Sequence, residues 1–258
     1  MEMDLNCDAG ESFGLYRLGL DEEAVPLVSS VNIACGFHGG DPRVMRRTVQ
    51  LAKRHGVSVG AHPSHPDLVG FGRRALDATP EEVADDVVYQ VGALLAFCRA
   101  EGVRLNHVKL HGALYNQAAT DASLADAVAA AVRSVDPGLV LVCLSGSAMV
   151  AAADRAGLRH LEEAFADRAY APDGQLVSRR LPGAVIHDPG MVAERVALMA
   201  TAHQVRAIDG SLVPLSAQTV CVHGDTPGAV GVLRAIRARL AQEGVRVRAF
   251  GAGEAARC

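Results

Sequence analysis

The sequence predicts an α/β protein in which a closed barrel of parallel strands is covered by helices. Short apolar runs alternate with amphipathic segments of helical length along the 258 residues, a pattern typical of a mostly parallel sheet with helices packed on it. Polar residues follow at least five of the predicted strands. A barrel gathers such contributions at one mouth, whereas a doubly wound open sheet concentrates its site at one switch point. We therefore predict a single (β/α)-barrel domain over residues 1–258 rather than an open sheet.

The strand and helix assignments rest on apolar runs and on helix start and stop signals. The predicted strands are 3–7, 31–34, 57–60, 107–109, 139–143, 160–165 and 219–222. The predicted helices are 42–55, 80–101, 121–135, 146–156, 189–202 and 226–243. Asp41 and Thr79 are expected N-caps, each followed by a proline that the first helical turn tolerates. Helices are expected to stop near Gly56, Gly102, Gly157 and Gly244. Residues 168–186 are expected to form a hairpin or long loop over one end of the fold.

Composition and charge exclude several classes of protein. The formal net charge of −4 gives no electrostatic reason to expect nucleic acid or an anionic membrane as a partner. No apolar run approaches the roughly 18–20 residues of a membrane span, and the acidic start 1–4 does not resemble an export signal. We therefore expect a cytoplasmic protein with reduced thiols. The six cysteines form no C-x-x-C; Cys7 and Cys35 are candidate nucleophiles, but burial as small apolar side chains is favoured for them.

Histidines recur at one kind of position. His38, His62, His111 and His223 each sit in a turn rich in glycine or proline that follows a strand. One such residue alone would more often be structural, but four in equivalent positions favour a functional site at the strand ends. Five other histidines are interpreted as structural, since they lie at strand entrances, near helix ends or beside an expected cap: His55, His107, His160, His187 and His203.

Two charged residues stand beside apolar strands. Lys109 lies between Val108 and Leu110, where a lysine is costly unless it is paired or functional; we expect it to contact a carboxylate, a phosphate or an oxyanion. Asp8 could be a helix cap, a metal ligand or a general base. Asp8, His62 and His111 together would make a two-histidine, one-carboxylate metal site, although no compact ligand motif supports a metal independently. The chain has no G-x-x-x-x-G-K-[ST] loop, no G-x-G-x-x-G and no G-x-S-x-G.

These motifs resemble those of the LamB/YcsF family of 5-oxoprolinase A subunits. The resemblance is carried, in order, by residues 4–14, 32–42, 60–64, 66–74, 107–116, 163–170 and 222–227. The opening block, Asp4-Leu5-Asn6-Cys7-Asp8-Ala9-Gly10-Glu11-Ser12-Phe13-Gly14, is especially specific. Two positions depart from the family pattern: Leu110 replaces a usual proline, and His65 replaces a usual aromatic residue. The resemblance implies a seven-stranded TIM-like barrel of the glycoside hydrolase/deacetylase type.

The resemblance also implies an activity, a co-substrate and partners. The expected reaction is ring opening of 5-oxo-L-proline (pyroglutamate) to L-glutamate, coupled to hydrolysis of ATP, supplied as Mg-ATP, with subunits B and C as partners. Phosphorylation of the lactam oxygen would activate the stabilised amide for attack by water. Self-association and a tightly bound metal are left open. Two rivals remain: a metal-dependent amide or N-acetyl hydrolase on the same barrel, and a non-catalytic scaffold subunit.

The expected roles divide the candidate residues into three groups. Lys109, with Arg73 or Arg74, would bind phosphate or the substrate carboxylate. The base would be one of Asp8, Glu11 and His62. Donors to the oxygen or leaving groups would be His38, His111 and His223. Further binding residues are expected to be Asn6, Asn116 and Asp225.

Overall fold

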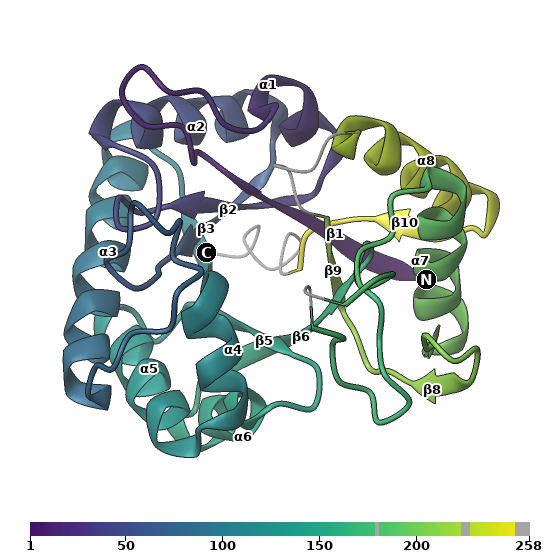
Figure 1. Cartoon of the computed structure of the whole chain (residues 1–258). Helices are drawn as coiled ribbons and strands as arrows, with labels where there is room; N and C mark the ends of the chain where they lie inside the picture. The colour runs from purple at the N-terminus through teal and green to yellow at the C-terminus, as the bar shows by residue number, and fades with distance from the viewer. Residues whose placement is uncertain (179–180, 223–227, 251–258) are drawn as a thin grey trace.

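The computed structural model describes residues 1–178, 181–222 and 228–250, and within them seven parallel strands close into a barrel (Figure 1). The strands, in order around the barrel, are β1 (Glu2–Ala9), β2 (Ser30–Ala34), β3 (Ser58–His62), β4 (Leu105–Lys109), β5 (Val140–Leu144), β6 (Arg159–Phe165) and β9 (Thr219–Val222). The pairing of β9 with both β6 and β1 closes the ring. The predicted barrel is therefore confirmed.

Helices surround the strands on the outside of the barrel (Figure 1). They are α1 (Asp21–Ala24), the 3₁₀ turn η1 (Val25–Leu27), α2 (Pro42–His55), α3 (Pro80–Glu101), α4 (Gly112–Thr120), α5 (Ala122–Val135), α6 (Ala148–Ala156), α7 (Pro189–Ala202) and α8 (Ala229–Gln242). Asp41 accepts hydrogen bonds from the N–H groups of Arg43 and Val44 at the start of α2, and Thr79 forms a capping box with Glu82 at the start of α3. Both predicted N-caps are confirmed.

Helix ends and short elements show where the sequence signals were sufficient and where they were not. Gly56, Gly102 and Gly157 adopt the left-handed backbone expected of C-caps. Helix α8 ends at Gln242, with Glu243 as its C-cap, and Gly244 beside it also has a left-handed backbone, as expected of a residue at a helix end. Helix α4 was missed because it begins at a glycine and has no side-chain cap. The short strands β7 (Gln204–Arg206), β8 (Leu212–Pro214) and β10 (Arg246–Val247) were also missed. The first two form a separate hairpin, and β10 adds to the start of β1.

Strands β1 and β3 run past their predicted ends, and this changes where two candidate residues lie. β1 continues to Ala9, so Asp8 pairs with Asn32 of β2 rather than following the strand. β3 continues to His62, which pairs with Ala34. Asp8 and His62 therefore belong to the rigid carboxyl ends of strands, where side-chain positions are fixed more tightly than in loops.

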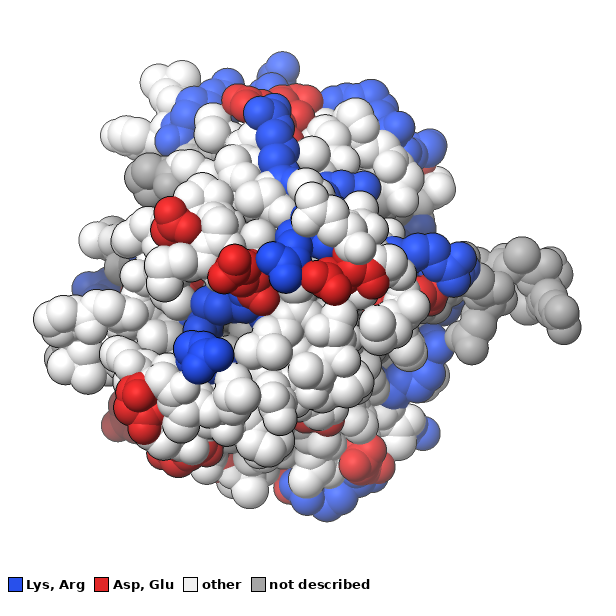
Figure 2. Space-filling model, turned by 90° about the vertical axis from the view of Figure 1, so that its right-hand side faces the viewer, with Lys and Arg blue, Asp and Glu red and all other residues white. Residues whose placement is uncertain are grey.

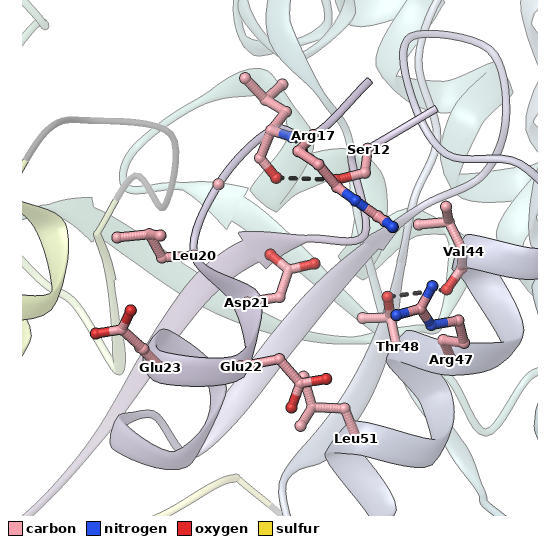
Figure 3. A pocket seen from close by; sticks show the side chains of 12 residues that line it. Ser12, Arg17, Leu20, Asp21, Glu22, Glu23, Val44, Arg47, Thr48 and Leu51 are labelled. Carbon is pink, nitrogen blue, oxygen red and sulfur yellow. Dashed lines mark hydrogen bonds between the residues drawn. The ribbon is translucent and has the colours of Figure 1, made fainter. Parts of the chain in front are cut away.

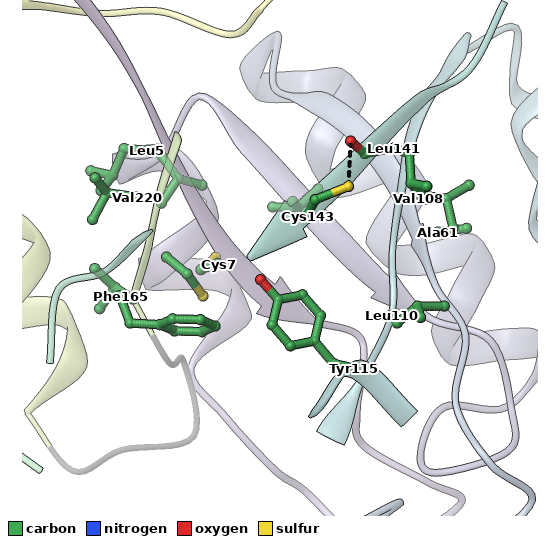
Figure 4. Close-up of a cluster of buried hydrophobic side chains, with 14 of the residues drawn as sticks. Leu5, Cys7, Ala61, Val108, Leu110, Tyr115, Leu141, Cys143, Phe165 and Val220 are labelled. Carbon is green, nitrogen blue, oxygen red and sulfur yellow. Dashed lines mark hydrogen bonds between the residues drawn. The ribbon is translucent and has the colours of Figure 1, made fainter. Parts of the chain in front are cut away.

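The core lies inside the barrel and between the barrel and its helices. Figure 4 shows apolar side chains from different strands and from α4 packed together, including Leu5, Val108, Leu141 and Val220. Within the part of the chain that the structure describes, no helix is both long and apolar enough to span a membrane. On the face in Figure 2, acidic and basic side chains are interspersed rather than gathered by sign.

Gly60 provides a test of how closely the barrel interior is packed. It pairs with His107 across β3 and β4, and a Cβ added at Gly60 would overlap the His107 ring, which hydrogen-bonds Asn32. We expect Gly60→Ala to lower the free energy of unfolding by about 1–3 kcal/mol or more through overpacking. The matched control is Gly92→Ala in α3, where a Cβ meets no atom within 4 Å; it should stabilise by about 0.5–1 kcal/mol. Urea unfolding of both variants measures the contrast, and equal effects would contradict it.

Candidate functional site

A cavity of about 410 Å³ opens at the carboxyl ends of the barrel strands. Its lining comes from β1, β3, β4 and β6, from α4, and from the loops that follow β3 and β6. The predicted loop 168–186 covers part of it with Arg168, Leu176, Val177 and Ser178. Arg168 Nη2 donates to the carbonyl oxygen of Val177 at 2.7 Å, which ties the two sides of this loop together. The mouth predicted from the strand ends therefore exists as a cavity.

Lys109 forms the centre of a charged cluster at the base of the cavity. Its Nζ lies 2.9 Å from Glu163 Oε1 and 3.2 Å from Asp8 Oδ1, and it donates to Asn6 Oδ1 at 3.3 Å. Burial alone would lower the pKa of Lys109, but Asp8, Cys221 and Glu163 outweigh burial and raise the pKa well above its usual value. Lys109 is therefore an ammonium ion that contacts two protein carboxylates, and a carboxylate is one of the partners that the sequence predicted for it.

Glu163 is a member of this cluster that the sequence analysis did not select. It is fully buried on β6, and its second carboxylate oxygen accepts a hydrogen bond from the hydroxyl of Tyr115 at 2.8 Å. Burial and the neighbouring Glu163 raise the pKa of Tyr115 well above its usual value, so its hydroxyl stays protonated. The sequence did contain a signal for Glu163, because a glutamate inside a strand-like run is as costly to bury as Lys109 is inside its own run. A buried charge needs a partner of opposite sign, and these two residues provide it for each other.

Asp8 faces the cavity from the end of β1. Its Oδ1 accepts a hydrogen bond from Asn32 Nδ2 at 2.9 Å and lies 3.4 Å from Nε2 of His62. With Lys109 on the other side, one oxygen of Asp8 contacts groups from three neighbouring strands. The side chain remains 11% exposed, which leaves Asp8 in reach of a molecule in the cavity.

Three of the four predicted histidines meet beside Asp8 and Glu11. Nε2 of His62 lies 3.0 Å from Nδ1 of His111, and the ring of His111 stacks on that of His38 with centroids 3.7 Å apart. Nε2 of His38 lies 3.3 Å from Oε1 of Glu11. Burial, reinforced by the neighbouring histidines, lowers the pKa of His38 well below its usual value and that of His111 to about 3. The side chains of His38, His62 and His111 thus gather at one point. They come from the loop after β2, from the end of β3 and from the loop after β4.

The two adjacent arginines have different environments. Arg73 lines the cavity, and its guanidinium lies 4.8 Å from the centre of the Phe71 ring. Nε of Arg74 instead donates to both carboxylate oxygens of Asp67, each at 3.0 Å. This pairing lowers the pKa of Asp67 to about 2. The sequence left Arg73 and Arg74 as alternatives for anion binding, and only Arg73 is among the cavity residues.

The remaining candidates fall in three different places. Asn116 is exposed and lines the cavity from α4. Asn6 is buried beneath it, where its amide nitrogen donates to Glu163 at 3.0 Å and to Thr219 at 2.7 Å, so it supports the cluster from below. His223 and Asp225 lie outside the described residues. The described candidates that do not themselves line the cavity are Asn6, Arg74 and His38, which is buried behind Glu11 and His111.

The two candidate cysteine nucleophiles are buried. Burial raises the pKa of Cys35 to about 12 and that of Cys7 well above its usual value. The Cys35 thiol donates to the carbonyl oxygen of Ile33 at 3.2 Å. Since the thiolate is the nucleophilic form, these positions favour packing over covalent catalysis, as the sequence analysis preferred.

A second cavity of about 440 Å³ lies between the loop after β1 and helices α1 and α2 (Figure 3). Its charged lining combines three carboxylates with two arginines: Asp21, Glu22, Glu23, Arg17 and Arg47. Its lining includes none of the candidate catalytic residues. The candidate catalytic residues that line a described cavity therefore line the one above Lys109, not this one.

Comparisons with known proteins agree on one family. The model of the LamB/YcsF family matches residues 3–255. A protein from Symbiobacterium thermophilum, named as the A subunit of 5-oxoprolinase, is 58% identical over 251 residues, which cover 97% of this chain and 96% of that protein. One of the same name from Pyrococcus furiosus is 53% identical, covering 97% and 98% of the two chains. The crystal structure of a lactam utilization protein from Thermus thermophilus superposes with a TM-score of 0.93 at 54% identity, covering 97% of this chain and all of that one.

Proposed function

This chain belongs to the LamB/YcsF family, and we propose that it is the A subunit of an ATP-dependent 5-oxoprolinase. The proposed reaction opens 5-oxo-L-proline to L-glutamate while ATP is hydrolysed to ADP and phosphate. We propose subunits B and C as its partners and the cytoplasm as its compartment. The observation that carries the proposal is the cavity at the strand ends, which Asp8, Lys109, His62 and His111 line together. The relatives that carry this name match the chain along nearly their full length.

The chemistry of the lactam explains why such a cluster is needed. A five-membered lactam is a stabilised amide, and transfer of the γ-phosphoryl group of ATP to its oxygen would give an imidate-like phosphate. Water then adds to the ring carbon, and cleavage of the carbon–nitrogen bond leaves γ-glutamyl phosphate with a free amine. A second water converts this acyl phosphate to glutamate and phosphate, so one ATP and two waters are consumed. Each addition of water calls for a base, and each phosphoryl group for nearby positive charge.

The geometry supports distinct roles for the cavity residues. Asp8 is the proposed base for water, because it borders the cavity and is oriented by Lys109 and Asn32. Lys109, whose ammonium group contacts Asp8, supplies positive charge at the base of the cavity. His62 and His111 line the same cavity beside Asp8, where they would help to position the attacking water. Arg73 would bind the substrate carboxylate at the edge of the cavity.

The paired arginines allow a direct test of substrate binding. We expect Arg73→Gln to raise the KM for 5-oxoproline by about 10- to 100-fold, since a charge-assisted hydrogen bond contributes about 1.5–3 kcal/mol. Arg74→Gln is the matched control, because Arg74 binds Asp67 and does not line the cavity. Steady-state kinetics of the complex with varied 5-oxoproline measures both. A larger effect at Arg74 than at Arg73 would refute the assignment.

The function itself is tested by omission of subunits. Glutamate and phosphate release from 5-oxoproline and Mg-ATP should require this chain together with subunits B and C, and neither this chain alone nor B with C should suffice. Glutamate production by B and C alone would overturn the proposal.

One specific observation favours a second candidate function. The convergence of Glu11, His38, His62 and His111 suits a metal-dependent amide hydrolase on the same barrel. That function predicts amide hydrolysis that a chelator abolishes and that needs no nucleotide. An assay of this chain alone, with and without ATP and chelator, separates the two functions.

A further inference from the structure

Each of the three clustered imidazoles has one ring nitrogen committed to an outward hydrogen bond. Nδ1 of His62 lies 2.8 Å from the carbonyl oxygen of Lys109, and Nε2 of His111 lies 2.9 Å from that of Phe71. A carbonyl oxygen only accepts, so both nitrogens carry the proton. Nδ1 of His38 lies 3.0 Å from the hydroxyl of Ser64, which itself donates to the carbonyl oxygen of His65 at 2.9 Å. Nδ1 of His38 is therefore also a donor.

These partners fix the tautomers and leave three lone pairs in one small space. In the neutral rings the unprotonated nitrogens are Nε2 of His38, Nε2 of His62 and Nδ1 of His111. The last two face each other at 3.0 Å, and Nε2 of His38 faces Oε1 of Glu11 at 3.3 Å. Acceptors that face one another repel unless a cation lies between them. The side chains concerned are buried, so bulk water does not screen this repulsion.

We propose that His38, His62, His111 and Glu11 bind one divalent first-row transition-metal ion, such as Zn²⁺. Their ligand atoms lie within 4.8 Å of one another, whereas ligands of a bound zinc ion lie roughly 3–4 Å apart, given bond lengths of about 2.0–2.2 Å. A small contraction, with the stacked His38 and His111 rings tilting apart, completes the site. Imidazole-rich ligand sets favour zinc-like ions over magnesium or calcium. A backbone carbonyl or hydroxyl behind each ring is the usual arrangement of metal-binding histidines.

Glu11, rather than Asp8, supplies the carboxylate of the proposed site. The sequence suggested Asp8 with His62 and His111, but Oδ1 of Asp8 already accepts from Asn32 and contacts the Lys109 ammonium. Oε1 of Glu11 lies 3.3 Å from His38 and 3.9 Å from His111, on the side where the lone pairs converge. The proposed ion would lie at the edge of the cavity, since three of its four ligands, Glu11, His62 and His111, line the cavity together with Asp8.

The test measures metal binding by the full chain, without a purification tag, 5-oxoproline or nucleotide, so that its result is independent of the proposed reaction. After treatment with a chelator and dialysis, the chain is titrated with Zn²⁺ in a calorimeter and with Co²⁺ in an absorption spectrometer. We expect one ion per chain and visible Co²⁺ d–d bands. Glu11→Gln and His111→Gln should each weaken Zn²⁺ binding by about 100-fold or more, and Ser64→Ala by about 10- to 100-fold through loss of the His38 partner.

The control variant is His55→Gln, which removes an exposed histidine at the end of α2 and should bind Zn²⁺ like the unmodified chain. Circular dichroism confirms that each variant is folded before titration, and the conservative Ser64→Ala provides a readout if a ligand variant does not fold. If the unmodified chain binds neither Zn²⁺ nor Co²⁺, the proposal is overturned. The short contact between His62 and His111 would then be explained by a proton shared between their facing ring nitrogens. Equal affinity in all variants would place the ion elsewhere and overturn it as well.

Discussion

Lys109→Met should abolish glutamate formation by the complex and also lower the free energy of unfolding by about 3–5 kcal/mol, the usual effect of leaving a buried charge without its partner. Lys109 is 2% exposed and Glu163 is fully buried, so the carboxylate of Glu163 would lose its ammonium partner without gaining water. Without a known partner for Lys109, its replacement by Met would be expected to leave the fold undisturbed. The observed ion pair changes that expectation, because the ammonium group of Lys109 neutralises the buried charge of Glu163 in addition to its proposed role in the cavity.

The double variant Lys109→Met with Glu163→Gln separates the two roles. A glutamine at this position is neutral and can still accept the hydrogen bond from Tyr115, so a large part of the lost stability should return while activity does not. Urea unfolding and the coupled glutamate and phosphate assay are read on the same preparations. Recovery of activity in the double variant would mean that Lys109 serves only to balance Glu163. A fully active single variant would remove Lys109 from the mechanism altogether.

The sequence predicted the fold and the end of the barrel at which the candidate residues gather, because both depend on local patterns. Period and turn signals mark the strands, and closure of a barrel then forces their carboxyl ends together. His62 and His111, which follow from this rule, lie 3.0 Å apart through their ring nitrogens although 49 positions separate them. The ends of the strands were predicted less accurately. β1 extends past Asp8 because Asp8 pairs with Asn32 of β2, and residues close to Asp8 in the sequence do not indicate this pairing.

Choices between similar residues required the three-dimensional structure. Nothing in the sequence separates Arg73 from Arg74, and only the contacts of Arg74 with Asp67 withdraw it from the cavity. Glu163 was not selected because its significance depends on Lys109, which lies on a strand that is not adjacent in the barrel. Long-range pairings of this kind carry no local signal, and they decide which charged group is catalytic and which one supports it.

Asp8→Asn should lower the turnover number for glutamate formation by about 10²- to 10⁴-fold, the usual contribution of a general base, with little change in the KM for 5-oxoproline. The amide cannot take a proton from water, but its oxygen can still accept from Asn32, and Lys109 retains Glu163. The loss of stability should therefore be smaller than for Lys109→Met. Steady-state kinetics of the three-subunit complex gives the turnover number and KM separately.

Two comparison variants decide whether Asp8 is the base. Asp126→Asn, which alters an exposed ion pair between α5 and α6, controls for removal of a carboxylate and should retain activity. Glu11→Gln tests the other carboxylate that lines the cavity. If Asp8 is the base, the defect of Asp8→Asn should resist added metal, whereas any defect of Glu11→Gln should diminish as the Zn²⁺ concentration rises, since that residue acts through the proposed ion. If Asp8→Asn remains active while Glu11→Gln is inactive and added metal does not restore it, then Glu11 rather than Asp8 is the base.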